Sequence, residues 1–283
     1  MIRFGILALL ATQAPNDIDA FMEKVLERRD INWEQYHEYF CRERAELVVE
    51  GSLPGVPLQG AQQEFLWFVR DGYFVRSPVS ADGVAISREQ RDREETKWIE
   101  RVKKRERERR PDREGFMGFK FEPGNYFLAG KQQVEGRELL VVEYYPQEGF
   151  SDDDEDEDKD EDEADDELEA KLNNTLVVTM LIDPEEHQIV RMTLDNYGFD
   201  FLPGRWLVQL DTFEASMVMH KPFEDVWLPR DITGYGKITT AAGSVSVRYT
   251  TTFYDYAKAE TSATFRFPAR GINETKDDDE KPK

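Results

Sequence analysis

Residues 197–232 read YGFDFLPGRWLVQLDTFEASMVMHKPFEDVWLPRDI, and this stretch decides the fold of the chain. It holds one long run of β-forming residues, Trp206–Met219, and most of a second, Val226–Tyr235, which ends just beyond it. A short loop that holds Lys221–Asp225 separates the two runs. Two such runs joined by a short polar loop pair as antiparallel neighbours. The stretch therefore predicts a broad sheet that is rich in aromatic and methionine side chains.

The composition supports a folded domain with an uneven charge. The 283 residues are 39% apolar and 12% aromatic, which is enough for a large core. The formal net charge of −22 argues against nucleic acid and against anionic membrane surfaces as partners. Much of it is local, because Asp152–Glu167 holds fourteen acids and only Lys159 as a base, a net of −13 that leaves −9 for the rest.

The first fourteen residues, MIRFGILALLATQA, have the layout of a short signal peptide. Arg3 precedes an apolar run from Phe4 to Ala11, and small residues stand near a cleavage point after Ala14. The alternative is an N-terminal helix packed on the core. No other run approaches the roughly 18 apolar residues of a membrane span. We therefore expect residues 1–14 to be a signal peptide. We also expect the protein to be periplasmic and to have no transmembrane span.

Helical periodicity appears in three places. Asn16 or Asp17 can cap a helix that runs to about Arg29, and Trp33–Arg44 predicts a second helix with Trp33, Tyr36, Phe40 and Cys41 on one stripe. Ser87 opens a highly charged third helix that runs to Arg110, and its only apolar patch is Trp98, Ile99 and Val102. We expect residues 87–111 to form a largely solvated helical excursion.

Period-two alternation marks the remaining elements as strands. Two of the predicted hairpins turn at Asp71-Gly72 and Glu135-Gly136, pairs that suit tight type I′ turns. Besides the two long runs, the predicted strands are Ala45–Glu50, Gln63–Arg70, a run from Tyr73, a run near Phe119, runs from Asn125 and Arg137, Leu176–Ile182, Ile189–Leu194 and Val245–Tyr256.

The predicted fold is α+β and mainly β. About 10–11 strands form a long curved antiparallel sheet, a half-open barrel wrapped over the N-terminal helices, because so wide a sheet must curl to protect its edges. Residues 15–270 form a single domain in this interpretation. We expect the acidic insertion 151–167 and the tail 271–283 to be disordered.

No motif for catalysis or metal binding is present. His37, His187 and His220 do not fall into zinc-binding spacings, and nucleophile-elbow and phosphate-loop motifs are absent. His37 and Cys41 would share a face of the predicted second helix, but no further ligands accompany them. The acids embedded in apolar context, Glu143, Asp211 and Glu214, are expected to face outward or to form ion pairs. We therefore expect no enzyme activity, no metal and no cofactor.

The aromatic and methionine residues allow two interpretations. They can form an ordinary core between sheet and helices, or part of the concave face can be a pocket for acyl chains, because methionine and aromatic side chains suit an adaptable apolar cavity. Both can hold at once. The candidate lining residues are Trp67, Trp206, Phe213, Met217, Met219, Trp227 and Phe253.

Four segments resemble the LolA/LolB-like superfamily of periplasmic lipoprotein carriers, and more closely its uncharacterised exported members. They are FVRDGYFVRSP (Phe68–Pro78), VVEYYP (Val141–Pro146), DFLPGRWLVQLD (Asp200–Asp211) and VWLPR (Val226–Arg230). The resemblance spans residues 20–260 and implies a curved sheet that binds lipid. It transfers no binding residue by position, and the acidic insertion and the charged helix depart from a compact carrier.

These observations together favour a periplasmic, non-enzymatic protein that shields an apolar ligand on the concave face of its sheet. The expected ligand is a lipid or the acyl chains of an acylated protein. The N-terminal helices would act as a lid. The second hypothesis is a cell-envelope scaffold with a filled core, whose charged helix or acidic insertion meets an envelope protein partner.

Overall fold

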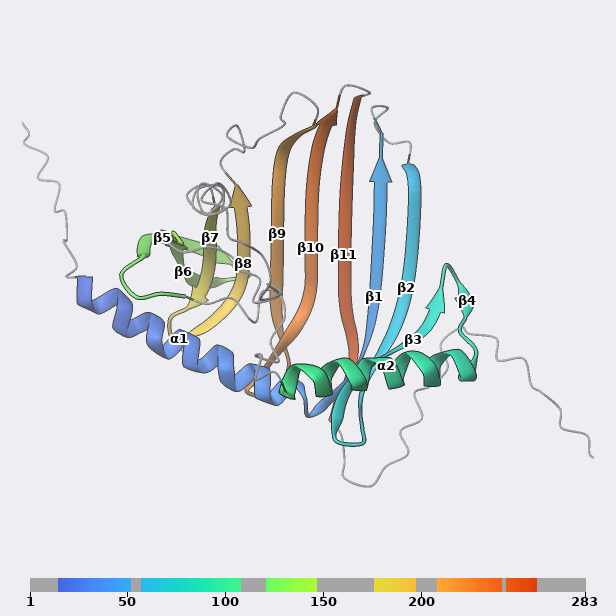
Figure 1. Cartoon of the computed structure of the whole chain (residues 1–283). Coiled ribbons are helices and arrows are strands. Elements are labelled where there is room, and N and C mark those ends of the chain that lie inside the picture. Colours follow the sequence, from blue (N-terminus) through green and yellow to red (C-terminus); the bar gives the residue numbers. More distant parts are fainter. Residues whose placement is uncertain are drawn as a thin grey trace, which may run out of the picture.

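The computed structural model describes residues 15–51, 57–107, 121–146, 176–196, 208–240 and 243–258. These residues form one antiparallel sheet of eleven strands and two helices, α1 and α2 (Figure 1). The predicted fold class is confirmed. The signal peptide 1–14, the acidic insertion 151–167, the strand near Phe119 and the tail 271–283 lie outside the described residues, so these remain predictions.

The strands follow the order β4-β3-β2-β1-β11-β10-β9-β8-β7-β6-β5 across the sheet. The first and last described strands, β1 and β11, therefore pair inside the sheet, and its two edges are β4 and β5. The bounds are β1 Tyr39–Glu50, β2 Pro57–Arg70, β3 Tyr73–Ala81, β4 Val84–Ala85, β5 Tyr126–Val134, β6 Arg137–Tyr144, β7 Leu176–Asp183, β8 Gln188–Asn196, β9 Val208–Phe223, β10 Val226–Thr240 and β11 Gly243–Lys258.

Local turn chemistry explains most of the hairpins. Asp71 and Gly72 have φ values of 54° and 83°, and Glu135 and Gly136 have values of 50° and 80°, so both central residues are left-handed as a type I′ turn requires. The organising hairpin of β9 and β10 turns at Glu224–Asp225, one residue after β9 ends at Phe223. Its strands are longer than predicted and its pairing is antiparallel, as predicted.

Helix α1 (Pro15–Tyr36) is a single helix, and the predicted second helix over Trp33–Arg44 is wrong in its second half. The chain leaves α1 at Tyr36 and enters β1 at Tyr39, so Cys41 lies on a strand. The error has a physical cause. Aromatic residues at three-to-four spacing imitate a helical stripe, but Tyr36 and Cys41 meet because the chain turns between them, with their side-chain oxygen and sulfur 3.8 Å apart.

Helix α2 (Arg88–Arg107) begins after Ser87, whose hydroxyl accepts a hydrogen bond from the backbone N–H of Gln90 at 3.3 Å. It packs beside β3 through Glu95, Ile99 and Val102, which are buried, while most of its other side chains are exposed, so the largely solvated excursion is confirmed and is docked on the sheet by its middle turns. It also belongs to the segment that carries the chain from edge strand β4 to the opposite edge strand β5.

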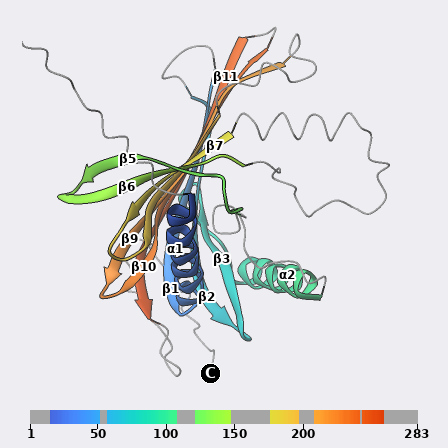
Figure 2. The same ribbon diagram turned by 90° about the vertical axis from the view of Figure 1, so that its left-hand side faces the viewer.

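The sheet is strongly twisted and does not close on itself. Figure 2 shows β5 and β6 turned away from the direction of the long strands, with α1 lying against the sheet and α2 beyond β3. A right-handed twist of this kind accumulates in any wide sheet. Both helices cross the same end of the strands (Figure 1), which we call the helix end; the end at the β10–β11 hairpin is the tip end.

Candidate functional site

The register of the strands shows which side chains share a face with α1. Phe253 of β11 lies on that face, because its ring is 6.4 Å from the ring of Tyr36 on α1. Directly paired residues point to the same side of a sheet, and so do residues two apart along a strand. Phe253 pairs with Glu43, and every second residue from there toward the tip end continues this helix-side face.

Helix α1 covers the helix end of this face with a filled hydrophobic cluster. Met22 and Val25 of α1 are completely buried against strands β6 to β10. Three of the predicted lining residues belong to this cluster: Met217, Met219 and Trp227, which are 3%, 4% and 2% exposed. These side chains are packed core in this structure, and a lining role for them stays a prediction.

A second cluster holds two more of the predicted lining residues, Trp67 and Phe253. Phe253 is buried with Tyr36 and Cys41, and Trp67 is half-buried against them. The indole N–H of Trp67 donates to the carboxylate of Glu43 at 2.6 Å, and the guanidinium of Arg76 donates to the same carboxylate at 2.8 Å. A buried acid is thus neutralised inside the apolar face, as buried charges require.

Beyond these clusters the helix-side face continues toward the tip end, and no described helix reaches it. The register places two rows there that are almost entirely apolar. One row joins Leu47 to Tyr249, and the next joins Val49 to Val247. We call this region the upper apolar face; Gln59, which pairs with Val49, is its polar member, and its described apolar members are Leu47, Val49, Ala61, Phe213, Ala215, Gly234, Gly236, Ile238, Val245, Val247 and Tyr249.

Two glycines leave room on the upper apolar face. Among the described residues, a Cβ atom built on Gly236 would meet no heavy atom within 4 Å, and one built on Gly234 would meet only the Cβ of Tyr249, at 3.9 Å. Neither residue has a positive φ, so no turn requires glycine at these positions. Glycine inside a strand often marks a place where another molecule or backbone approaches closely.

The opposite face of the same strands is polar. Thr239 donates to Asp211 at 2.6 Å, and the hydroxyls of Ser216 and Thr233 are 2.9 Å apart. On β1 and β2, Arg44 and Glu64 form an ion pair at 2.9 Å on the solvent side. The long strands are therefore largely amphipathic, including the part that α1 does not cover, and Val48 and Tyr235 are apolar exceptions on the polar face.

Of the remaining predicted lining residues, Phe213 lies on the upper apolar face and Trp206 lies outside the described residues. The sequence prediction missed most of this face because its members are aliphatic or glycine and carry no conspicuous side chain. A signal was present in β11, where Val245, Val247 and Tyr249 alternate with polar residues.

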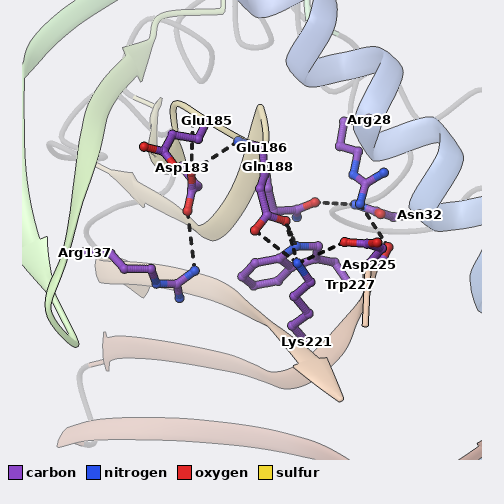
Figure 3. Close-up of polar contacts among 10 residues, drawn as sticks. All are labelled: Arg28, Asn32, Arg137, Asp183, Glu185, Glu186, Gln188, Lys221, Asp225 and Trp227. Carbon is purple, nitrogen blue, oxygen red and sulfur yellow. Dashed lines mark hydrogen bonds and ion pairs between the residues drawn. The ribbon is translucent and has the colours of Figure 1, made fainter. Parts of the chain in front are cut away.

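Polar contacts fasten α1 to the hairpins at the helix end (Figure 3). The Asn32 side-chain amide donates to Gln188 at 2.7 Å, and both residues are buried. Arg28 donates to the backbone carbonyl of Asp225 at 3.1 Å. Within the described residues, however, Arg28 Nε, Asn32 Oδ1 and Gln35 Oε1 are buried without a hydrogen-bond partner. Such groups cost about 1–3 kcal/mol each, so α1 is held less firmly than its apolar contacts alone suggest.

Glu186 is the centre of the charged contacts in Figure 3. It accepts hydrogen bonds from the indole of Trp227 at 2.7 Å and from Lys221 at 3.1 Å. Partial burial alone would raise the pKa of Glu186, but these two donors outweigh it and hold the pKa below its usual value. The carboxylate therefore stays charged at neutral pH and links β9 and β10 to the β7–β8 turn.

The chemical groups singled out in the sequence do not come together. Cys41 lies on β1 and not on a helix with His37, and burial raises the pKa of its thiol to about 12. Its sulfur is therefore a neutral thiol and a poor nucleophile. Glu143 bonds the hydroxyl of Tyr145, and Asp211 bonds Thr239. Among the described residues no group of three or more His, Cys, Asp or Glu side chains could hold a metal.

The described part of the chain also offers no membrane-spanning helix, because neither helix combines the necessary length with apolar character.

Comparison with known proteins adds the following. No protein-family model matches the chain, and no curated protein matches it in sequence. Among solved structures, a DUF1329 family protein from Desulfovibrio piger is 10% identical, with 89% of this chain and 96% of that chain covered and a TM-score of 0.35. The MucA/MucB complex of Pseudomonas aeruginosa is also 10% identical, with 84% and 94% covered and a TM-score of 0.22. At these values neither likeness assigns a function, and the resemblance to LolA/LolB-like carriers stays a prediction.

Proposed function

We propose that this chain is a non-enzymatic, periplasmic binding protein whose upper apolar face shields the hydrocarbon of a lipid or of an acylated protein. The observation that carries the proposal is the continuation of an apolar, glycine-containing face past the end of α1 on strands whose other side is polar. A sheet exposed to water on both faces has no reason to keep this alternation. The face therefore has an apolar occupant.

The dimensions of the face suit an acyl chain. On β10 the face runs from Gly234 to Ile238, roughly 14 Å at the usual rise per residue, and counting from Ile232 in the cluster under α1 extends it to roughly 20 Å. Five neighbouring strands, β9 to β2, give a width of roughly 19 Å at the usual spacing. An acyl chain in a bilayer occupies about 15 Å, half of the hydrocarbon thickness. A chain can therefore lie along the strands with its whole length on the sheet.

The energetics favour hydrocarbon. Burial of an acyl chain contributes about 0.8 kcal/mol per CH₂, so a chain of ~14 carbons supplies on the order of 10 kcal/mol before entropic costs. Under this proposal α1 acts as a lid. Its buried unpaired polar atoms keep its attachment weak enough for the ligand to displace it and to extend onto Met217 and Ile232 beneath.

The proposal is tested with two adjacent residues that face opposite sides of β11. Val247→Glu places a charge on the upper apolar face, and Ser246→Glu places the same charge on the polar face. We expect Val247→Glu to weaken binding of a fluorescent C16 fatty acid by at least tenfold, because a charge must be desolvated to make room for hydrocarbon. Ser246→Glu should bind as the wild type does. Equal binding by both variants would refute the proposal.

A second candidate, an envelope scaffold that binds a protein partner, is favoured by one observation: most of the predicted lining residues are already packed against α1. Native mass spectrometry of protein purified from its own periplasm separates the two. Copurified lipid supports the binding protein. A bound protein with no lipid supports the scaffold.

A further inference from the structure

The charge of this protein is segregated, and α2 carries the cationic part. The eleven residues Lys97–Arg107 contain six bases and two acids, a net of +4 in a chain whose total is −22. Exposed cationic side chains run along the helix from its second turn to its end: Arg93, Lys97, Arg101, Lys103, Lys104 and Arg107.

The helix presents these cations on one side because its other side is docked. Glu95, Ile99 and Val102 are buried toward β3, and Glu95 accepts a hydrogen bond from Ser77 at 2.6 Å as well as an ion pair from Arg70. The indole N–H of Trp98 donates to the backbone carbonyl of Phe74 at 2.9 Å. These contacts fix the rotation of α2 about its axis.

The outward stripe follows from helix geometry. Arg93, Lys97, Lys104 and Arg107 are spaced four, seven and three residues apart, so they lie on one side of the helix, opposite Ile99 and Val102. Only Glu100 interrupts the stripe among the side chains that the structure describes.

Few described acids neutralise the exposed cations of α2, both on this stripe and beside it. Lys97 pairs with Glu94 at 2.8 Å. Arg101 and Lys103 instead lie over the rings of Trp98 and Tyr73, at 5.1 and 5.2 Å from the ring centroids. The guanidinium of Arg107 donates to the backbone carbonyl of Lys103. For these three residues no described carboxylate lies within ion-pair distance, so their charge is available to a partner.

We propose that the outward face of α2 docks on the anionic headgroups of a phospholipid membrane. The proposal rests on the proposed function, because a protein that takes up acyl chains must meet the bilayer that holds them. A stripe of cations along a helix of 20 residues, roughly 30 Å long, matches a flat anionic surface. Both helices lie at the same end of the sheet (Figure 1), so docking through α2 brings α1 and the covered end of the site to the membrane.

The net charge of the chain does not oppose this docking. At physiological salt the screening length is about 8 Å, so acids farther from the contact are largely screened. The expectation that the protein avoids anionic membranes rested on its net charge, whereas the exposed side of α2 is locally cationic. Each cation near such a surface contributes about five-fold to binding.

The test measures flotation of the full chain, at physiological salt, with vesicles that contain roughly a third of phosphatidylglycerol in phosphatidylcholine. The variant Arg101→Gln/Lys103→Gln/Arg107→Gln removes the three cations that no described carboxylate neutralises, and it should bind about 100-fold more weakly than the wild type. The control variant Lys131→Gln/Lys237→Gln/Arg248→Gln removes three cations from the sheet and should bind as the wild type does. Thermal unfolding checks that both variants are folded.

Equal loss in both variants would overturn the docking surface, because it would show a nonspecific charge effect. Failure of the wild type to bind these vesicles more tightly than pure phosphatidylcholine vesicles would overturn it too. The Val247→Glu variant separates this idea from the proposed function. It should lose fatty-acid binding but keep vesicle binding. If the wild type binds vesicles through α2 but neither it nor any variant binds the fatty acid, the proposed function is refuted and the docking surface is not.

Discussion

At the scale of single residues, the buried acid Glu43 shows how the helix-side face tolerates charge. Its side chain is 3% exposed, and it is neutralised by Arg76 and by the indole of Trp67. The ring of Phe65 lies under the same guanidinium, at 3.4 Å. The acid therefore fixes β1, β2 and β3 relative to one another inside an otherwise apolar surface.

Replacing Glu43 by Gln should destabilise the protein by about 3 kcal/mol, because a half-buried guanidinium then loses its partner charge. Urea unfolding monitored by tryptophan fluorescence measures the change. The control is Glu138→Gln, which removes the acid of the exposed Lys131–Glu138 pair and should cost less than about 1 kcal/mol. A similar loss for both would show that Glu43 is not buried as described.

Glu186 gives the protein an acid sensitivity with a defined sign. Its pKa is lowered in the folded state, so its contribution to stability is complete above the unfolded value of about 4.3. That contribution is lost as the pH falls through the folded pKa. The free energy of unfolding should therefore fall less steeply below about pH 4.3 in Glu186→Gln than in the wild type. Parallel curves for the two proteins would contradict this assignment.

At the scale of elements, the sequence predicted what depends on neighbours in the chain. The hairpins at Asp71-Gly72 and Glu135-Gly136 were predictable because turn chemistry is local. The pairing of β1 with β11 was not predictable, because paired residues such as Leu47 and Tyr249 are some 200 residues apart in the chain. The sequence of neither strand specifies which strand it pairs with. The docking of α2 on β3 depends on the same kind of distant contact, here Ser77 with Glu95 and Phe74 with Trp98.

The strand β10 offers a test of the open space on its helix-side face. Gly236→Val should raise the free energy of unfolding by about 0.5–1 kcal/mol, because valine suits a strand and its Cβ meets no described residue at this position. The same variant should weaken fatty-acid binding, because its side chain fills the space that the ligand uses. Urea unfolding and fluorescence titration measure the two effects.

The control for this variant is Gly72→Val, which places valine at a φ of 83° in a type I′ turn and should destabilise the protein. Loss of stability in Gly236→Val would show that the space above this glycine is already occupied in solution.

At the scale of the whole molecule, an antiparallel sheet is covered by α1 at one end and remains apolar on the same side at the other. The alternation within β11 was visible in the sequence, from Val245 to Phe253. Which part of that face α1 would cover was not, because it depends on where Tyr36 and Met22 meet the sheet. The sequence could therefore predict that the sheet has an apolar face, but it could not predict which part of that face α1 leaves uncovered.

The central claim is that hydrocarbon lies on the upper apolar face, and photo-crosslinking with a diazirine-labelled palmitate tests it most directly. The protein is irradiated with the probe, digested and mapped by mass spectrometry. The account predicts adducts on alternate residues of the central strands, at Leu47, Ile238 and Val247, with none on the polar neighbours Lys237 and Arg248. Adducts spread equally over both faces, or confined to residues outside this sheet, would contradict it.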